Sequence, residues 1–388
     1  MADTRFRKSR FAATAAVFGA AAIAALSTSA PAQAQGDVRG QGQAGAISGS
    51  YIVVLDDAEA NAQSLAGRYG ADVENVWSAA IDGFEATMSA SEARRMAADP
   101  AVDYVEQNSE VHVLDQSSPP SWGLDRIDQR DLPLDDYYGY DSTGAGVTAY
   151  IIDTGIRTSH EDFEGRATWG TSTARGPKKD CNGHGTHVAG TVGGAQHGVA
   201  KDVSLVAVKV LDCNGSGTWA GVIDGIDWVT DNAQKPAVAN MSLGGGYNST
   251  INDAVQRSID SGVSYAVAAG NEDTDACTKS PASTPDAITV GATDDTDTRA
   301  YFSNYGDCVD IFAPGVAITS TWNGSDTDTT TISGTSMAAP HVAGAAALYL
   351  EGSPGASPDQ VTNALTGNAT TGVVNDPLGS PNLLLYTG

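Results

Sequence analysis

The chain has 388 residues, enough to bury one large core and a second, smaller domain. Its 47 acidic residues against 21 lysines and arginines give a formal net charge of −26 at pH 7. Such a surface repels phosphates and anionic lipid headgroups, so we expect neither nucleic acid nor a membrane as a partner. Two interpretations of the acidity stay open: solubility with calcium buffering outside the cell, or adaptation to high salt or cold marine conditions.

The first 34 residues have the pattern of a signal peptide. Basic residues between positions 5 and 10 precede an apolar run over 11–26, and Ala32-Gln33-Ala34 supplies the small residues of a cleavage site. A membrane anchor is the alternative, but the run is short and rich in alanine. We therefore expect a signal peptide over 1–34 and a secreted, extracellular protein.

Residues 35–114 predict a linker followed by a small α+β domain. The segment 36–50 is rich in Gly, Gln and Ala, which is typical of a flexible linker. Six elements then follow in the order β-α-β-β-α-β, over 51–55, 58–69, 73–77, 83–88, 89–98 and 102–107. This order is that of a ferredoxin-like domain, with a generic α+β module as the alternative.

From about Trp122 the pattern predicts a larger α/β domain. Short β-branched runs at 147–152, 203–210, 237–241, 263–269 and 287–290 alternate with amphipathic stretches such as 218–233 and 252–261. Strands that alternate with helices indicate a parallel sheet covered on both faces. Ligands bind such sheets at the carboxyl ends of strands, and Asp153 and Asn271 both follow a predicted strand.

The cysteines form an even set in a chain that we expect to be exported: Cys181, Cys213, Cys277 and Cys308. Disulfides persist outside the cell, and four cysteines allow three connectivities. Spacings of 32 and 31 residues favour two sequential loops. A zinc site is the alternative, but the sequence has no C-x-x-C pair.

Three segments rich in small residues carry the chemistry. They are Ile151-Ile152-Asp153-Thr154-Gly155, Asn182-Gly183-His184-Gly185-Thr186-His187 and Gly334-Thr335-Ser336-Met337-Ala338-Ala339-Pro340. A serine becomes a nucleophile when a base takes its proton and a buried carboxylate orients that base. The order Asp, His, Ser and the flanking glycines resemble the subtilase superfamily of serine proteases. The resemblance implies Asp153, His184 and Ser336 as the triad.

Each of these residues has a plainer interpretation. Ser336 precedes an apolar helical run and could simply cap a helix, and Asp153 could be a turn residue. His184 and His187 lie three residues apart and could hold a metal. Metalloprotease helices use H-E-x-x-H, whereas Gly185-Thr186 stand between these histidines. We interpret His184 as the base and His187 as a structural neighbour.

The same resemblance extends to an oxyanion hole and a substrate cleft. It implies that the Asn271 side chain and the Ser336 backbone N–H hold the oxyanion. Two segments would pair with the substrate as added strands. The first pocket would be apolar, without a charge at its base, and Trp219 would wall the fourth pocket unless it is a core residue. The substrate residues are Gly215, Ser216, Gly217, Trp219, Ser242, Leu243, Gly244, Ala268, Ala269 and Gly270.

Two cysteine positions narrow the resemblance, from about Asp115 onward, to the proteinase K group and its aqualysin branch. Cys181 stands just before Asn182-Gly183-His184, and Cys213 lies within 211–217. This likeness implies the pairs Cys181–Cys213 and Cys277–Cys308. It also implies structural calcium, with no cofactor for catalysis. One site would use the carbonyls of Pro285 and Ala287 with the Asp310 carboxylate. A second, or else a solvated acidic turn, would use Asp125, Asp128, Gln129 and Asp135.

The α+β domain resembles the inhibitory propeptide that precedes many subtilases. Self-cleavage between Leu114 and Asp115 would then separate residues 35–114 from a catalytic domain over 115–388, with Leu114 in the first pocket and Val111 in the fourth. We expect a monomeric, self-processing serine endopeptidase of broad specificity that prefers aromatic or aliphatic residues before the scissile bond. An inactive, calcium-binding acidic protein and a metal-dependent hydrolase using His184 and His187 are the alternatives.

Overall fold

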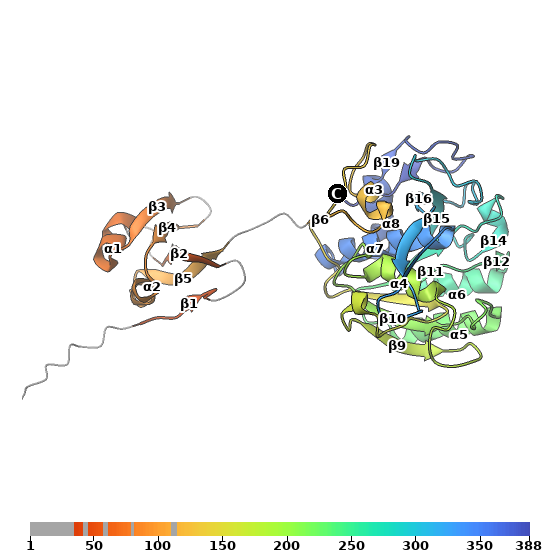
Figure 1. Ribbon diagram of the computed structural model, residues 1–388, viewed down its shortest axis with the longest axis horizontal. Coiled ribbons are helices and arrows are strands. Elements are labelled where there is room, and N and C mark those ends of the chain that lie inside the picture. Colours follow the sequence, from red (N-terminus) through yellow and green to blue (C-terminus); the bar gives the residue numbers. More distant parts are fainter. Residues whose placement is uncertain (1–34, 42–45, 57–60, 79–80, 110–114) are drawn as a thin grey trace, which may run out of the picture. The chain divides into compact units, whose positions relative to one another are not determined.

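The computed structural model describes residues 35–41, 46–56, 61–78, 81–109 and 115–388. The chain divides into two compact units, Met1–His112 and Val113–Gly388, which are considered separately below (Figure 1). The predicted signal peptide at 1–34 lies outside the described residues. So does Leu114, on one side of the predicted cleavage point.

The N-terminal unit has the predicted ferredoxin-like arrangement. Two helices, α1 (Ala62–Tyr69) and α2 (Ala90–Met96), pack on a sheet with the order β1-β5-β2-β4-β3. Its core includes Val53, Phe84 and Val105, which are fully buried, and burying a side chain of this kind stabilises the fold by about 1.5–3 kcal/mol. The strands are β1 (Val38–Arg39), β2 (Ala46–Leu55), β3 (Asp72–Trp77), β4 (Gly83–Thr87) and β5 (Val102–Ser109).

The predicted linker at 36–50 is wrong in part, because it contributes to this sheet. Val38–Arg39 pairs in parallel with β5, and β2 begins at Ala46. Backbone pairing needs no apolar side chain, so this strand has no hydrophobic pattern in the sequence. A cation–π contact also links the two strands, because the Arg39 guanidinium lies 3.7 Å from the centre of the Tyr104 ring. The start of α2 follows its sequence signal: Ser89 and Glu92 form a reciprocal capping box.

The C-terminal unit is built on a nine-stranded sheet with the order β19-β20-β16-β15-β13-β11-β8-β10-β9. Neighbouring strands run parallel except β19 and β20. The bounds are β8 (Thr148–Asp153), β9 (Ala167–Ser172), β10 (Ser204–Lys209), β11 (Ala237–Met241), β13 (Ser264–Ala268), β15 (Ile288–Thr293), β16 (Ile311–Pro314), β19 (Thr370–Thr371) and β20 (Leu383–Leu384).

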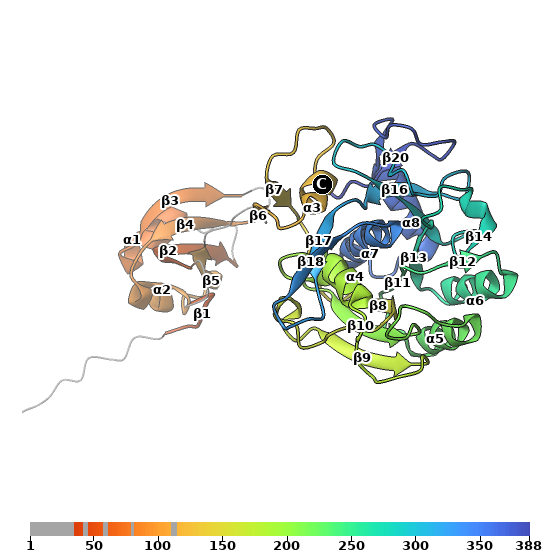
Figure 2. The ribbon, with the colours of Figure 1, turned by 45° about the vertical axis from the view of Figure 1, so that its right-hand side comes forward.

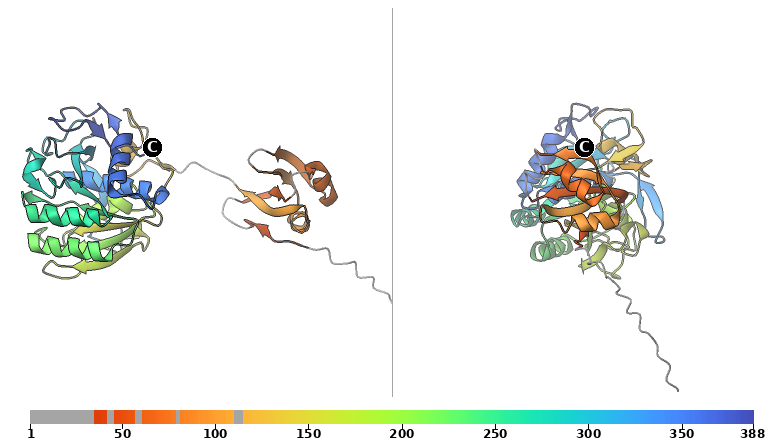
Figure 3. Two further views of the ribbon diagram at one scale, coloured as in Figure 1. Left: turned by 180° about the vertical axis from the view of Figure 1, so that it is seen from behind. Right: turned by 90° about the vertical axis from the view of Figure 1, so that its left-hand side faces the viewer.

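Helices cover both faces of this sheet, as the alternating pattern predicts. Helices α4 (His184–Gly193) and α7 (Thr335–Gly352) pack on one face, and α5 (Trp219–Asn232) and α6 (Ser249–Asp260) on the other (Figure 2). Figure 3 shows α5 and α6 lying side by side. Along β8, Ile151 enters the core beneath α4 and α7, while Ile152 enters the core beneath α5 and α6.

The remaining elements are short or lie at the edge of the unit. Further helical elements are α3 (Trp122–Ile127), α8 (Pro358–Asn368) and the 3-10 helices η1 (Glu161–Phe163) and η2 (Ala276–Thr278). Three two-stranded ribbons pair β6 (Asp115–Ser117) with β7 (Tyr137–Gly139), β12 (Gly245–Gly246) with β14 (Lys279–Ser280), and β17 (Ile318–Thr321) with β18 (Thr329–Ile332). The loops after β8, β11 and β13 and the first turns of α4 and α7 carry the candidate site.

Candidate active site

Asp153 and His184 are joined directly. Asp153 is the last residue of β8 and is fully buried, and His184 is the first residue of α4. The His184 Nδ1 atom lies 2.8 Å from Oδ1 and 2.9 Å from Oδ2 of Asp153. Helix and strand approach this closely because position 185 is glycine: a Cβ there would stand 2.2 Å from the Gly155 carbonyl oxygen. The carboxylate thus holds the imidazole by one nitrogen and leaves Nε2 free to act as a base.

Asp180, which sequence reasoning missed, fixes the loop that carries His184. Its Oδ1 accepts the backbone N–H groups of Asn182 and Gly183, at 3.0 and 2.9 Å. Its Oδ2 accepts both the N–H and the hydroxyl of Thr186. The Thr154 hydroxyl, one residue past Asp153, also donates to Oδ1. One buried carboxylate therefore ties the end of β8 to the start of α4.

The electrostatics favour a protonated imidazole at His184. Burial of much of the ring opposes its charge, but the Asp153 carboxylate outweighs burial through its charge and hydrogen bond. The negative charge of Asp180 adds to the effect, and the pKa of His184 is raised above its ordinary value. The pair can therefore stabilise the imidazolium that forms when a nucleophile gives up its proton.

Ser336 is the second residue of α7, at the positive end of a long helix. Its hydroxyl donates to the Ser242 carbonyl at 3.2 Å, and the Ser242 hydroxyl donates to the Ser336 carbonyl at 2.8 Å. Within the described part of the chain no hydrogen bond joins Ser336 to His184. Catalytic hydrogen bonds are often long or misaligned before substrate binds, so this rotamer is compatible with a nucleophile.

Asn271 lies beside the Ser336 backbone in an orientation fixed by Thr335. The Thr335 N–H and hydroxyl both donate to the Asn271 Oδ1 atom, at 2.8 and 2.9 Å, so that Nδ2 is the end left to donate. A Cβ on Gly334 would lie 3.6 Å from both the Asn271 Nδ2 and the Ser336 N atoms. Two N–H donors thus border one small space, as an oxyanion hole requires.

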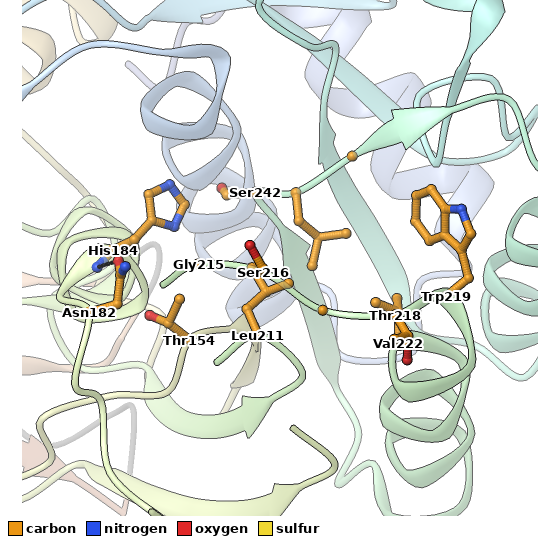
Figure 4. A pocket seen from close by; sticks show the side chains of 13 residues that line it. Thr154, Asn182, His184, Leu211, Gly215, Ser216, Thr218, Trp219, Val222 and Ser242 are labelled. Atoms are coloured by element: carbon orange, nitrogen blue, oxygen red, sulfur yellow. Dashed lines mark hydrogen bonds between the residues drawn. The ribbon is translucent and has the colours of Figure 1, made fainter. Parts of the chain in front are cut away.

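A cavity of about 710 Å³ runs from His184 to Trp219 (Figure 4). It lies between the loop over 211–217 and the segment Ser242-Leu243-Gly244, with Trp219 at the far end. Trp219 packs over Gly245, where a Cβ would stand 2.7 Å from its ring. Seven of the ten predicted substrate residues line this cavity: Gly215, Ser216, Gly217, Trp219, Ser242, Leu243 and Gly244.

The other three predicted substrate residues line an adjoining cavity of about 110 Å³. Ala268, Ala269 and Gly270 form part of its wall together with Asn271 and Ser336, and both cavities share Leu243 and Gly244. The sequence predicts a first pocket without a charge at its base. The lining of the smaller cavity also includes Glu272 and Lys279. Neither residue has a sequence signal for this position.

The disulfides join the pairs that the resemblance implies, Cys181–Cys213 and Cys277–Cys308. The first connects the segment before His184 to the cleft loop over 211–217. Beside it, the Asn182 side-chain amide donates to the Cys213 carbonyl at 3.2 Å. One wall of the larger cavity is therefore attached to the residues that position the base.

His187 has hydrogen-bond and ring contacts of its own, separate from those of His184. Its Nε2 atom lies 3.1 Å from the Ile318 carbonyl, and its ring packs edge-on against Trp322. Burial lowers the pKa of His187 to about 3, so the ring stays neutral. Within the described ranges no group of three or more His, Cys, Asp and Glu side chains is arranged to hold a metal ion. The two histidines have separate partners, which is what a structural role for His187 predicts.

The predicted calcium residues Asp125, Asp128 and Asp135 are not arranged as a metal-binding group in the described part of the chain, but they include one buried carboxylate. Burial raises the pKa of Asp128 to about 6, with smaller contributions from the charges of Asp125 and Asp135. Its Oδ1 atom is buried without a hydrogen-bond partner. Gln129 lies in the same loop and donates to the Pro133 carbonyl at 2.9 Å. A buried, unpartnered carboxylate oxygen among like charges is a site that a cation would stabilise.

The other predicted set of calcium ligands is built around Asp310. Its Oδ2 atom accepts the Thr289 N–H at 2.7 Å, and burial raises the pKa of Asp310 to about 6. Pro285 and Ala287 precede β15 in the loop before Thr289, and would contribute carbonyl oxygens only. Hard cations such as Ca²⁺ take backbone carbonyls together with carboxylates.

A buried Asp–His pair, a serine at a helix start and two N–H donors beside that serine are the groups that serine hydrolases of the Asp-His-Ser type use. The comparisons with known proteins place this chain within that class. Residues 144–383 match the model of the subtilase family, and residues 50–114 match that of the peptidase inhibitor I9 family. The chain belongs to the subtilase family of serine proteinases, with an I9 inhibitor domain before it.

Individual relatives agree with this assignment. An "Extracellular serine proteinase" of Thermus sp. is 56% identical over 332 residues, which cover 85% of this chain and 81% of that protein. A "Cuticle-degrading serine protease" of Arthrobotrys oligospora is 44% identical over 95% of this chain and 97% of its own. A crystal structure of a cold adapted subtilisin-like serine proteinase shares 55% identity with a TM-score of 0.67, covering 69% of this chain and 98% of that one. None of the helices in the described ranges combines the length and the apolar character that a membrane-spanning segment needs.

Proposed function

We propose that this chain is the precursor of a secreted serine endopeptidase that hydrolyses peptide bonds through an acyl-enzyme. Asp153 orients His184, His184 takes the proton of Ser336, and Ser336 attacks the scissile carbonyl. Asn271 Nδ2 and the Ser336 N–H then hold the oxyanion. The observation that carries the proposal is the convergence of these two donors beside a serine, next to the 2.8 Å Asp153–His184 contact.

The catalytic cycle follows from the residues at hand. The Ser336 hydroxyl rotates from the Ser242 carbonyl toward His184 and transfers its proton to Nε2 as the C–O bond forms. The imidazolium returns that proton to the amine leaving group as the C–N bond breaks. Water, deprotonated by His184, then hydrolyses the acyl-serine and restores the hydroxyl. The Asp153 carboxylate stabilises the imidazolium.

Substrate recognition is proposed to rest mainly on backbone pairing. The segments over 211–217 and 242–244 border the larger cavity with Gly215, Gly217 and Gly244, which offer backbone groups with little side-chain obstruction. Strand addition of this kind gives affinity without reading the sequence. Ala268 and Ala269 give the first pocket an apolar wall, which supports a preference for aromatic or aliphatic residues before the scissile bond.

The zymogen and calcium proposals rest on the domain order and on buried carboxylates. The I9 domain would inhibit the catalytic domain until it is degraded, after self-cleavage between Leu114 and Asp115. Structural calcium would bind Asp125, Asp128, Gln129 and Asp135 at one site, and Asp310 with the Pro285 and Ala287 carbonyls at another. When bound it would neutralise buried carboxylates, and it would take no part in the reaction. We also propose a monomer that acts on proteins and peptides outside the cell.

Active-site labelling tests the proposed function. A fluorophosphonate probe should attach to mature wild-type protein and to Ser325→Ala, which removes an exposed serine from a loop. It should not attach to Ser336→Ala. Equal labelling of all three proteins would show that Ser336 is not the nucleophile. Labelling of none would favour the inactive interpretation.

A further inference from the structure

A cluster of positive charge lies on the loop that leads to His184. Arg175, Lys178 and Lys179 are all exposed and stand within one stretch of five residues, 175–179, which we call the basic loop. The chain as a whole carries a formal net charge of −26, with 47 acidic residues against 21 lysines and arginines. Even so, no carboxylate of the described ranges forms an ion pair with any of the three cations.

Two carboxylates on neighbouring segments are engaged elsewhere. Asp180, directly after the basic loop, is buried and accepts the hydrogen bonds described above that hold the start of α4. Asp212, in the cleft loop over 211–217, uses its Oδ1 atom to accept the N–H groups of Asn214 and Ser216, at 2.8 and 3.1 Å. Because neither carboxylate pairs with it, the basic loop keeps its charge at the surface.

Both ends of the basic loop are fastened to the rim of the larger cavity. Before the loop, the Thr173 hydroxyl donates to the Gly221 carbonyl, in the first turn of α5, at 2.6 Å. After the loop, Cys181 is bonded to Cys213 in the cleft loop. A Cβ on Gly176 would lie 3.9 Å from the Cys213 Sγ atom, so the basic loop itself passes beside this disulfide. The three cations therefore belong to a fixed segment at the rim of the cavity.

These attachments place the basic loop at the His184 end of the cavity. Asn182 lies beside His184 in the cavity wall (Figure 4), and its side chain donates to the Cys213 carbonyl at 3.2 Å. Trp219 lies at the far end, where the fourth pocket is proposed. An extended peptide advances about 3.3 Å per residue, so the second and third residues before the scissile bond would lie nearest the basic loop.

We propose that the basic loop attracts acidic side chains of the substrate at the second and third positions before the scissile bond. A surface with a large negative net charge repels an acidic polypeptide, and a local group of cations beside the cleft reverses that field where the peptide binds. Charges at such a rim favour encounter and orientation of the partner. The proposal rests on the proposed function and deepens it by naming a preferred substrate class, polypeptides with acidic residues at these two positions.

Peptide substrates that carry glutamate or glutamine at a single position test the basic loop. The readout is the ratio of kcat/KM for glutamate to kcat/KM for glutamine, measured on mature enzyme at about 0.01 M ionic strength, where the screening length is about 30 Å. The triple variant Arg175→Gln/Lys178→Gln/Lys179→Gln should lower this ratio about fivefold at the second and third positions. This is the size expected for three unit charges roughly 10 Å away in a high dielectric. At the more distant fifth position the ratio should fall less than about twofold.

A matched control removes the same amount of positive charge elsewhere. The double variant Lys178→Gln/Lys179→Gln is compared with Lys235→Gln/Arg257→Gln, which alters exposed residues that line neither cavity. Only the first of these should lower the ratio, and 1 M salt, where the screening length is about 3 Å, should abolish the difference between them. A smaller folded fraction cannot mimic the shift, because each ratio is measured on one preparation.

Three results would overturn the proposal. The first is a ratio in the triple variant that stays within about 1.5-fold of wild type at every position. The second is an equal fall in the control variant, and the third is an equal fall at the fifth position, because the charge would then act on the peptide as a whole. Absence of Ser336-dependent cleavage of every peptide, with glutamate or with glutamine, would instead overturn the proposed function.

Discussion

The two halves of the candidate site differ in how complete they are. Around His184 the supporting contacts are in place: Asp153 holds the ring at 2.8 Å, and Asp180 holds the loop through Asn182, Gly183 and Thr186. Around Ser336 the backbone and the Asn271 amide are fixed, but the hydroxyl donates to the Ser242 carbonyl. The proposed base is organised before substrate arrives, whereas the proposed nucleophile is one side-chain rotation away from use.

This difference separates the groups that are preorganised from the group that must move during the reaction. The groups that must stabilise charge, the carboxylate and the oxyanion donors, are held by buried hydrogen bonds and cost no reorganisation during reaction. The group that must move is the Ser336 side chain, which consists of little more than a hydroxyl. Variants on either side should therefore lose different things: transition-state stabilisation on the Ser336 side, and positioning and pKa control on the His184 side.

The largest of these effects is expected on the nucleophile side. Asn271→Ala removes one oxyanion donor and should lower kcat by about 10²–10³-fold, the size measured for such a donor in subtilisin. KM should change little, because the ground-state substrate gains less from this donor than the transition state does. Steady-state kinetics check this, with Asn232→Ala on the exposed end of α5 as the control. A rise in KM of the same size, with kcat unchanged, would contradict the assignment of Asn271 to the oxyanion hole.

A smaller effect is expected from Asp180 on the base side. Asp180→Asn keeps one oxygen acceptor but removes the charge, so the loop loosens and kcat/KM should fall between about 10- and 100-fold. The charge of Asp180 raises the pKa of His184, so the variant should also lose activity at a lower pH than wild type does. Asp202→Asn makes the same charge change at an exposed position and serves as the control. A purely structural Asp180 would leave the pH profile where it is.

The pH profile of the wild-type enzyme tests the His184 side of the site. His184 must be neutral to accept a proton, and its raised pKa means that it protonates at a higher pH than an ordinary histidine. Activity should therefore fall on the acid side at a pH above 6.5, the ordinary value. The neighbouring His187 and His341 have pKa values lowered to about 3 and about 4, and stay neutral there. A fall in kcat/KM centred below 6.5 would contradict this account.

Calcium removal should affect neither half of the site directly. Chelation should lower the Tm of the mature enzyme by several degrees, since uncompensated charge returns to Asp128 and Asp310. Below that temperature kcat should be nearly unchanged, because the proposed ligands lie outside the triad. Asp128→Asn, with no charge to neutralise, should show a smaller calcium effect on Tm. Immediate loss of kcat on chelation at low temperature would contradict a purely structural role.

Residues that belong to short local motifs can be predicted from the sequence. Asp153, His184, Asn271 and Ser336 each stand among small residues that admit close backbone approach, and these local motifs are the basis on which we predict their roles. The β-α-β-β-α-β order of the N-terminal unit and the parallel sheet follow from the spacing of apolar runs. Families that share these motifs share the fold, which the comparisons show.

Residues that act through tertiary contacts were not predictable in this way. Asp180 follows two lysines in an exposed loop, and its five hydrogen bonds depend on how that loop folds back on Thr154. Glu272 and Lys279 meet only because β14 pairs with β12. Val38–Arg39 lies in a Gly-rich segment, and pairs with a strand more than 60 residues later in the chain. Each of these contacts joins segments that are brought together by the fold, so a local sequence pattern does not predict it.

Intact-mass analysis of purified precursor, wild type beside Ser336→Ala, tests the central claim most directly. Both proteins are incubated with and without calcium under the same conditions. The account predicts that wild type alone is cut near Leu114–Asp115, because Ser336 is the nucleophile that processes its own chain. Equal cutting of both precursors would contradict it and assign the cleavage to another protease.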